Sequence, residues 1–167
     1  MRVGADFFFL LLQCHVLSIA VLGPGLPSWD VARSILGGEQ RYQRTEFEIP
    51  AVTWLPPTER RRVGKMVRLA LTVGNAAVRA AAIDASKVAT VFTSSSGDGD
   101  NCDAIFTTLA HNEKSERFIS PTRFHNSVHN ASAGYWSIAN HCTLPSTSLC
   151  AYDASFAAGL VEACCQA

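Results

Sequence analysis

Three segments of the chain are short and apolar enough to be strands of a buried sheet. Residues 16–22 and 88–93 are nearly continuous apolar runs with β-branched members, and residues 147–152 form a mixed-apolar segment that follows Pro145. Strands of this kind are covered on both faces by helices. The pattern therefore predicts an α/β fold with a mainly parallel sheet.

Apolar residues at helical spacing separate these segments. The clearest helix is predicted over residues 59–82 with Thr58 as its N-cap. A shorter helix is predicted over residues 28–36, capped by Ser28 and ended by a Gly-Gly pair. Three prolines within residues 40–57 exclude a regular helix there, so that stretch is predicted to be a loop with extended pieces.

The polar loop 94–101 carries closely spaced Asp and Asn residues, which suggest a calcium site. A calcium loop also needs a distal bidentate glutamate and a correctly placed glycine, and neither is present. We therefore expect Asp100 or Asn101 to be the N-cap of a helix over residues 103–110, followed by a polar connection over residues 111–120.

The segment 149–160 predicts a strand, a tight turn and a helix in immediate succession. Small residues after Tyr152 open a helical pattern that runs to the C-terminus. Such a turn places one side chain at its apex, above the first unpaired N–H groups of the helix, where developing negative charge is stabilised. Many acyl-transfer enzymes carry a nucleophile at this position.

The composition excludes several classes of function. The 167 residues are enough for one domain with a buried core, and 48% of them are apolar against 17% charged. The formal net charge is zero, so the chain lacks the basic excess typical of proteins that bind nucleic acids or anionic membranes. The local basic cluster Arg60, Arg61 and Arg62 is either a solvated face or a docking patch for an acidic partner.

Cysteine and histidine spacing offers two further kinds of site. The six cysteines form no Cys-x-x-Cys pair, which favours buried free thiols over disulfides or a metal cluster. His125 and His129 lie four residues apart and would share one face of a helix, where His141 and Cys142 could complete a metal site. Because no acidic or thiol partner is fixed by the sequence, we assign no metal.

The first residues have the outline of a signal peptide, with a basic start and a block of Phe and Leu. Asp6 directly before this block, and the absence of a clear cleavage site, argue against secretion, and the block is too short to span a bilayer. We therefore expect residues 1–15 to be an extension outside the fold, residues 16–167 to be the domain, and the protein to be cytoplasmic.

Residues 153–160, Asp-Ala-Ser-Phe-Ala-Ala-Gly-Leu, resemble the elbow of β-ketoacyl synthases of the thiolase superfamily, commonly Asp-Thr-Ala-Cys-Ser-Ser-Ser-Leu. The alignment places Phe156 where those enzymes carry the acyl-bearing cysteine. Residues 124–138 resemble the Asn-x-x-x-Gly helix region that precedes the elbow. Together with residues 22–27 and 94–101, they are most similar to the chain length factors of aryl polyene (xanthomonadin-type) pigment clusters.

This resemblance implies the N-terminal half of a thiolase-like, αβαβα layered fold, which ends inside the elbow helix. It implies a non-catalytic chain length factor that pairs with an active ketosynthase, is served by an acyl carrier protein and malonyl extenders, and needs no cofactor. Six residues would then lie at the subunit contact or the acyl tunnel: His125, Asn126, His129, Asn130, Tyr135 and Trp136. Core packing is the alternative role for the two aromatic residues.

Two alternatives remain open at this stage. Ser155 would be the nucleophile of an acyltransferase or thioesterase-like enzyme if the turn were displaced by one residue, with His125 or His129 as its base; otherwise Ser155 is an N-cap. The chain would instead be a truncated, nonfunctional or purely interacting fragment, because an incomplete sheet leaves unpaired strand edges.

Overall fold

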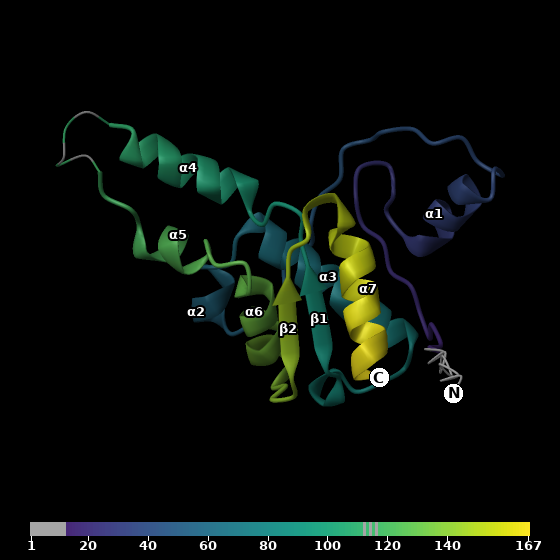
Figure 1. Cartoon of the computed structure of the whole chain (residues 1–167). Helices are drawn as coiled ribbons and strands as arrows, with labels where there is room; N and C mark the ends of the chain where they lie inside the picture. The colour runs from purple at the N-terminus through teal and green to yellow at the C-terminus, as the bar shows by residue number, and fades with distance from the viewer. Residues whose placement is uncertain (1–12, 112, 114, 116) are drawn as a thin grey trace, which may run out of the picture.

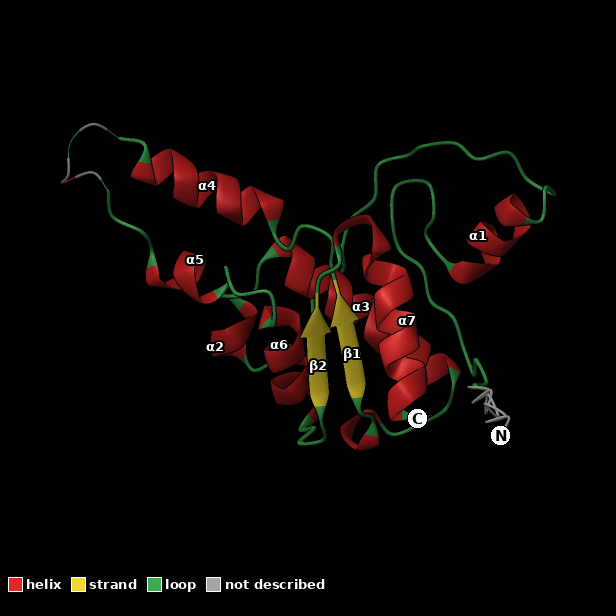
Figure 2. Cartoon of the chain, viewed as in Figure 1, coloured by secondary structure: helices red, strands yellow, loops and turns green. Residues whose placement is uncertain are grey.

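The computed structural model describes residues 13–111, 113, 115 and 117–167. Most of the expected N-terminal extension therefore lies outside the described residues. The fold consists of short helices around a small sheet (Figures 1 and 2). In chain order the elements are α1 (Trp29–Leu36), α2 (Pro57–Arg60), α3 (Lys65–Ala80), η1 (Ala85–Lys87), β1 (Thr90–Thr93), α4 (Gly99–Leu109), α5 (Pro121–His125), α6 (Ala131–Asn140), β2 (Ser146–Leu149), η3 (Tyr152–Ala154) and α7 (Ser155–Gln166).

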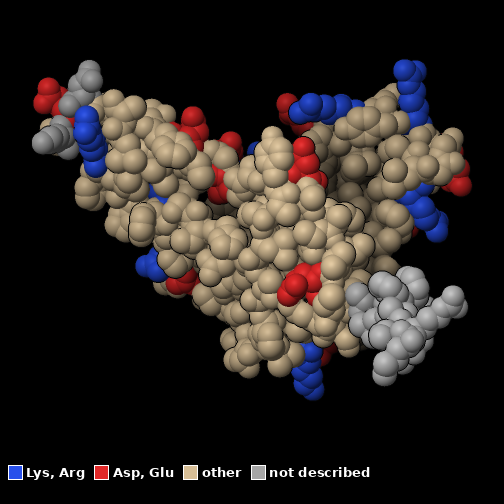
Figure 3. Space-filling view, in the orientation of Figure 1, with Lys and Arg blue, Asp and Glu red and all other residues tan. Residues whose placement is uncertain are grey.

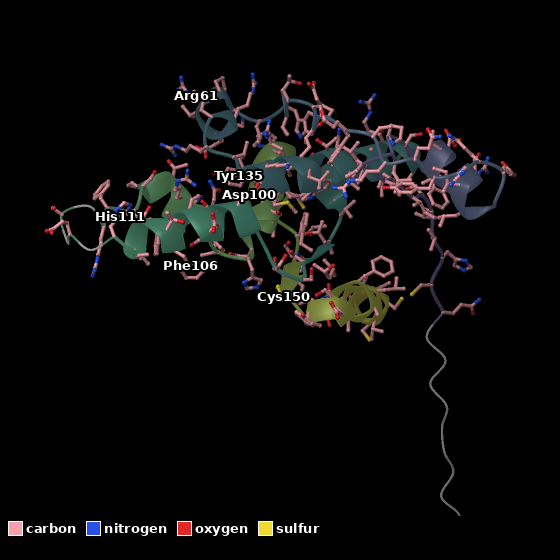
Figure 4. The ribbon with its side chains drawn as sticks, turned by 90° about the horizontal axis from the view of Figure 1, so that it is seen from above. Arg61, Asp100, Phe106, His111, Tyr135 and Cys150 are labelled. Carbon is pink, nitrogen blue, oxygen red and sulfur yellow. The ribbon has the colours of Figure 1, made fainter. Side chains whose placement is uncertain are left out.

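The sheet of the described residues consists of β1 and β2, which run parallel with Thr90 opposite Ser146 and Thr93 opposite Leu149. Helix α7 packs on one face of the sheet, while α6, backed by α3, packs on the other (Figures 1 and 4). Helices α4 and α5 form an arm that projects from this body (Figure 1). The layered, mainly parallel α/β architecture expected from the sequence is confirmed.

The strand predicted over residues 16–22 does not form. Residues 13–22 run as irregular extended chain, fastened by a hydrogen bond from Ser18 Oγ to the carbonyl of Ala77 in α3 at 2.7 Å. Val16 and Leu17 are each 73% exposed. An apolar run becomes a strand only when a neighbouring strand pairs with its backbone, and no described segment lies in that position. The prediction was wrong because composition alone does not supply a partner.

The helix predicted over residues 59–82 is divided in two. Helix α2 begins at Pro57 rather than after a Thr58 cap, and the chain turns extended at Gly64, the N-cap of α3. The guanidinium of Arg60 donates to the carbonyls of Thr53 and Leu55 at 2.6 and 3.0 Å, which ties α2 back onto the preceding loop. These bonds hold α2 out of line with α3.

Two predicted helix starts can be compared directly with the structure. The N-cap of α1 is Ser28, whose hydroxyl accepts from Val31 N at 3.4 Å, as predicted. Helix α4 is capped by Asp98, which accepts from Asn101 N at 3.1 Å, and not by Asp100 or Asn101. The correction follows from chain direction: only a side chain before the first turn can reach its unpaired N–H groups.

The core lies between α3, α6 and the loop before α2. Its fully buried members are Val52, Leu55, Val67, Leu71, Tyr135, Trp136 and Cys142. The Trp136 ring lies against Gly74 of α3, where an added Cβ would come within 2.8 Å of the indole. The same ring meets Phe92 of β1 edge-on, with ring centroids 6.2 Å apart. One tryptophan thus joins helix α6 to both α3 and the sheet.

Helix α7 approaches the sheet closely at Gly159. This residue is buried, and a Cβ in its place would overlap Thr93 Cγ2 of β1. Gly134 in α6 is different, because no atom lies within 4 Å of its Cβ position.

We expect Gly159→Ala to lower the free energy of unfolding by about 1–3 kcal/mol, because the methyl group would push α7 off β1. Urea denaturation of the full chain measures this. Adding Thr93→Ser, which removes the overlapping methyl group, should restore most of the loss. The control Gly134→Ala should raise stability by about 0.5–1 kcal/mol, since alanine favours a helix over glycine. Equal behaviour of the two alanine variants would show that α7 does not rest on Thr93.

Candidate functional site

The carboxyl ends of the two parallel strands meet at one edge of the sheet. Ligands of open α/β sheets bind at this edge. A cavity of about 360 Å³ opens there, lined by apolar residues of α3, both strands and the α5–α6 connection, with polar groups at its rim. Its apolar wall includes Met66, Phe92, Val128 and Leu149.

A second cavity, of about 440 Å³, adjoins the first. The two share Met66, Thr93 and the loop 94–97, and the second cavity continues to Tyr152, Ser155 and Phe156 at the start of α7. The turn that the sequence predicts to carry a nucleophile therefore faces the second cavity. This cavity shares lining residues with the first, apolar cavity.

The turn is held by the side chain of Ser155. Its hydroxyl accepts from Ala151 N at 2.9 Å and donates to the carbonyl of Tyr152 at 2.6 Å, with the carbonyl of Ser94 at 3.4 Å. Tyr152 adopts the left-handed conformation (φ +50°), which makes the turn tight. Ser155 is only 4% exposed. It is the first residue of α7 and not the N-cap that the sequence predicts, because Ala154 occupies the N-cap position.

Phe156 follows as the second residue of α7, with 79% of its surface exposed. It stands at the start of the helix, beside the second cavity, as the predicted strand–turn–helix requires. A benzyl side chain has no ionisable proton and no lone pair with which to form an acyl bond. The position can therefore shape the hollow, but it cannot carry a substrate covalently.

The two histidines expected on one helix face do not share one, because α5 ends at His125 and His129 lies in the following turn. The His125 ring meets Tyr135 edge-on at 5.9 Å, and His129 Nε2 lies 3.0 Å from the carbonyl of Ser148 in β2. In the described part of the chain, no group of three or more His, Cys, Asp or Glu residues could hold a metal ion.

The two other candidate metal ligands serve the fold. Cys142 is buried and donates its thiol to the carbonyl of Val88 at 3.4 Å. His141 ends α6 in the left-handed conformation (φ +50°). Neither side chain is placed beside His125 or His129 as a ligand set would need.

The two asparagines of the same region differ in role. Asn126 is buried and donates its amide to the carbonyl of Arg62 at 2.6 Å, which links the end of α5 to the α2–α3 connection. It also lines the first cavity. Asn130 occupies the N-cap position of α6 without a side-chain capping bond, and it is exposed.

Tyr135 and Trp136 lie in the core, each 2% exposed, and line neither cavity. Their contacts within this chain are those of core packing, one of the two roles that the sequence leaves open. The Tyr135 hydroxyl has no hydrogen-bond partner among the described residues. Burial, and to a smaller extent the negative charge of Glu59, raise the pKa of Tyr135 above its ordinary value.

The three arginines of the basic cluster are not equivalent. Arg60 is committed to loop carbonyls, and Arg62 pairs with Glu59 at 3.4 Å. Arg61 is exposed and makes no contact with the other described side chains or carbonyls. Figure 4 shows it at the outer side of α2, away from Cys150, which lies near the start of α7.

A family model described as "Beta-ketoacyl synthase, N-terminal domain" matches residues 37–167. The chain belongs to the β-ketoacyl synthase family. Among solved structures, a complex of a ketosynthase (ApeO) with its chain length factor (ApeC) from Xenorhabdus doucetiae contains a chain 30% identical to this one, with a TM-score of 0.67. The match covers 86% of this chain and 57% of that chain. A search of curated proteins found no match.

These comparisons confirm the family and the thiolase-like fold expected from the elbow motif. This ketosynthase-like chain spans little more than half of the chain it matches. None of the helices in the described residues is long and apolar enough to cross a membrane.

Sequence reasoning missed several cavity residues. Met66 lines both hollows, although its helical spacing indicated only core packing. Cys150 and Val128 also line the first cavity. A signal existed for Cys150 alone, because it directly follows a strand and the carboxyl ends of parallel strands gather at one edge.

The buried hydroxyl of Tyr135 gives a pH-dependent prediction. Because the folded-state pKa is raised, the unfolded chain releases this proton first as pH rises through about 10, and stability falls from there upward. Tyr135→Phe should flatten this alkaline decline and raise the neutral-pH free energy of unfolding by about 1 kcal/mol, since it removes an unpaired buried hydroxyl.

Urea denaturation between neutral and alkaline pH measures both effects. The control is Tyr42→Phe, which removes a hydroxyl bonded to the carbonyl of Pro24 at 3.1 Å on the surface. It should keep the alkaline decline because Tyr135 is still present. An unchanged decline in Tyr135→Phe would contradict the assignment.

Proposed function

We propose that this chain is a non-catalytic, chain-length-factor-type ketosynthase homologue that pairs with an active ketosynthase and limits its acyl tunnel. The observation that carries the proposal is the exposed Phe156 at the start of the elbow helix. Decarboxylative condensation requires a nucleophile there to hold the acyl chain as a thioester. Phe156 instead offers bulk.

The alternative serine chemistry has no support in the site geometry. A serine nucleophile needs a free hydroxyl with a base within hydrogen-bond reach. The Ser155 hydroxyl is buried and bonded to the backbone of the elbow. The imidazole of His129 is directed to Ser148 instead. In this chain the Ser155 hydroxyl thus maintains the shape of the elbow.

A broad face with few charged side chains supports pairing with a second subunit. In Figure 3 the surface over α7 and β2 is mostly tan, with isolated red patches of Asp or Glu. Large apolar side chains are exposed on α7 and directly before it, among them Tyr152, Phe156, Leu160 and Val161. An apolar surface of this kind marks a contact site. The similar solved chain comes from a complex of a ketosynthase (ApeO) with its chain length factor (ApeC). This pairing is consistent with a ketosynthase as the partner.

The product and the donor are inferred from the sequence resemblance and the surface charge. The similarity of residues 94–101 and 124–138 to chain length factors of aryl polyene clusters supports an aryl polyene chain as product, with its apolar portion beside the first cavity. The unpaired Arg61 supports docking of an acidic acyl carrier protein near α2. Under this proposal, docking of the carrier protein and synthesis of the chain both take place in the cytoplasm.

Phe156→Ala should lengthen the products of the reconstituted complex by an extender unit or more, because the smaller side chain enlarges the space at the elbow. Product masses from the complex supplied with acyl carrier protein and malonyl thioester measure this. Phe106→Ala, which removes an exposed phenylalanine of α4 outside both cavities, is the matched control. An unchanged product profile in Phe156→Ala would refute the limiting role.

Intact mass after the same reaction tests the absence of catalysis. We expect an acyl adduct on the ketosynthase and none on this chain, in wild type and in Ser155→Ala alike. An adduct on the wild-type chain that disappears in Ser155→Ala would establish serine chemistry in place of the proposed role.

Arg61→Glu should weaken binding of the acyl carrier protein by about tenfold, the effect of reversing one charge that faces an acidic partner. Titration calorimetry of the complex at low and high salt measures it, and the difference should shrink at high salt. Arg79→Glu reverses an equally exposed charge in the last turn of α3. Equal losses in both variants would indicate a general charge effect rather than docking at α2.

A further inference from the structure

Two cysteines from opposite ends of the chain meet at the C-terminal end of α7. The thiol of Cys14 lies 3.9 Å from the carbonyl oxygen of Cys164, to which it donates. Cys14 is exposed, Cys164 is partly buried, and both are free thiols. The segment that carries Cys14 passes beside α7 (Figure 1), and Ser18 fastens it to α3.

The Cys14 thiol also affects the pKa of the Cys164 thiol. A side-chain hydrogen bond from Cys14 is the largest cause that raises the pKa of the Cys164 thiol, followed by burial and by the nearby Cys14 charge. The contact of the Cys14 thiol with the Cys164 carbonyl places Cys14 beside the residue to which a disulfide would join it. Because Cys164 is held as the thiol, the exposed Cys14 is the group that reacts first.

We propose that Cys14 and Cys164 form a disulfide on exposure to a peroxide, and that this bond fastens the N-terminal segment to α7. The Cys14 thiolate attacks a peroxide oxygen, which breaks the O–O bond, releases water after protonation and leaves a sulfenic acid. The Cys164 thiolate then attacks that sulfur, forming the S–S bond and releasing a second water. Two thiols lose two electrons and two protons, and the peroxide is reduced to two waters.

The other cysteines are less well placed for this reaction. Cys165 is the sequence neighbour of Cys164 on α7, and a bond between adjacent residues would strain the geometry that a disulfide needs. Cys142 is buried and bonded to Val88. Cys102 and Cys150 line the first cavity, near the other end of α7.

The bond would act on a segment that nothing else holds firmly. Residues 13–22 form no strand, and most of their apolar side chains are exposed. Among the described residues, the side-chain hydrogen bonds of this stretch are that of the Cys14 thiol and that of the Ser18 hydroxyl. Oxidation therefore changes how long the segment stays on α3 and α7.

The test uses the full chain, reduced and then treated with hydrogen peroxide. We expect a product about 2 Da lighter by intact mass, the loss of two hydrogens, that reverts with a thiol reductant. Cleavage after Glu39 and Glu162 should yield residues 1–39 joined to residues 163–167. Cys14→Ser and Cys164→Ser should abolish this joined product, whereas Cys165→Ser should keep it.

A disulfide that persists in Cys14→Ser, or that needs Cys165, would overturn the assignment. The second readout is amide hydrogen exchange. Residues 13–22 should exchange at least about tenfold more slowly in the oxidised wild type than in the reduced protein, and Cys14→Ser should show no such change. If the bond forms without slowing exchange, the fastening role is refuted.

Discussion

The elbow depends on one buried hydroxyl. Ser155 bonds to the backbone of Ala151 and Tyr152 after β2 and lies close to the carbonyl of Ser94 after β1, so it joins the loops that leave both strands. A hydroxyl that holds this junction keeps a left-handed residue in place and sets the direction in which α7 begins. The orientation of Phe156 follows from it. Because the same oxygen would be needed as a nucleophile, structural and chemical roles of Ser155 exclude each other.

The face of the sheet that α6 and α3 cover depends on close contacts that small residues permit. Gly74 leaves room for the Trp136 indole, and the indole packs against Phe92. Phe92 in turn lines the first cavity. The core therefore reaches the cavity wall through this aromatic pair and through Val67. Among the residues that the structure describes, this arrangement leaves the Tyr135 hydroxyl and the Trp136 N–H buried without hydrogen-bond partners, which costs stability. The first cavity therefore lies between the edge of this core and the loops after β1 and α5.

The sequence was sufficient for features that are encoded locally. The α/β class, the Ser28 cap and the strand–turn–helix at residues 149–160 follow from apolar spacing and turn residues, and the structure confirms them. Features that depend on distant partners were not predictable. Residues 16–22 are apolar but have no strand to pair with, and Arg60 breaks a helical pattern by bonding to loop carbonyls. The core position of Tyr135 and Trp136 likewise follows only from how α6 meets α3.

Helix α7 runs from the elbow to Cys164, which lies beside Cys14, and different contacts hold its two ends. Ser155 and Gly159 hold its first turns against β1 and the loops, and the close approach at Thr93 leaves no room for the helix to slide. A bond at Cys164 would therefore restrain the N-terminal segment, which is loosely held, before it could displace Phe156. For the same reason, a different side chain at residue 156 need not disturb the fold, because this side chain projects outward from a turn that other residues maintain. The surface around the elbow is therefore set independently of the group that residue 156 presents.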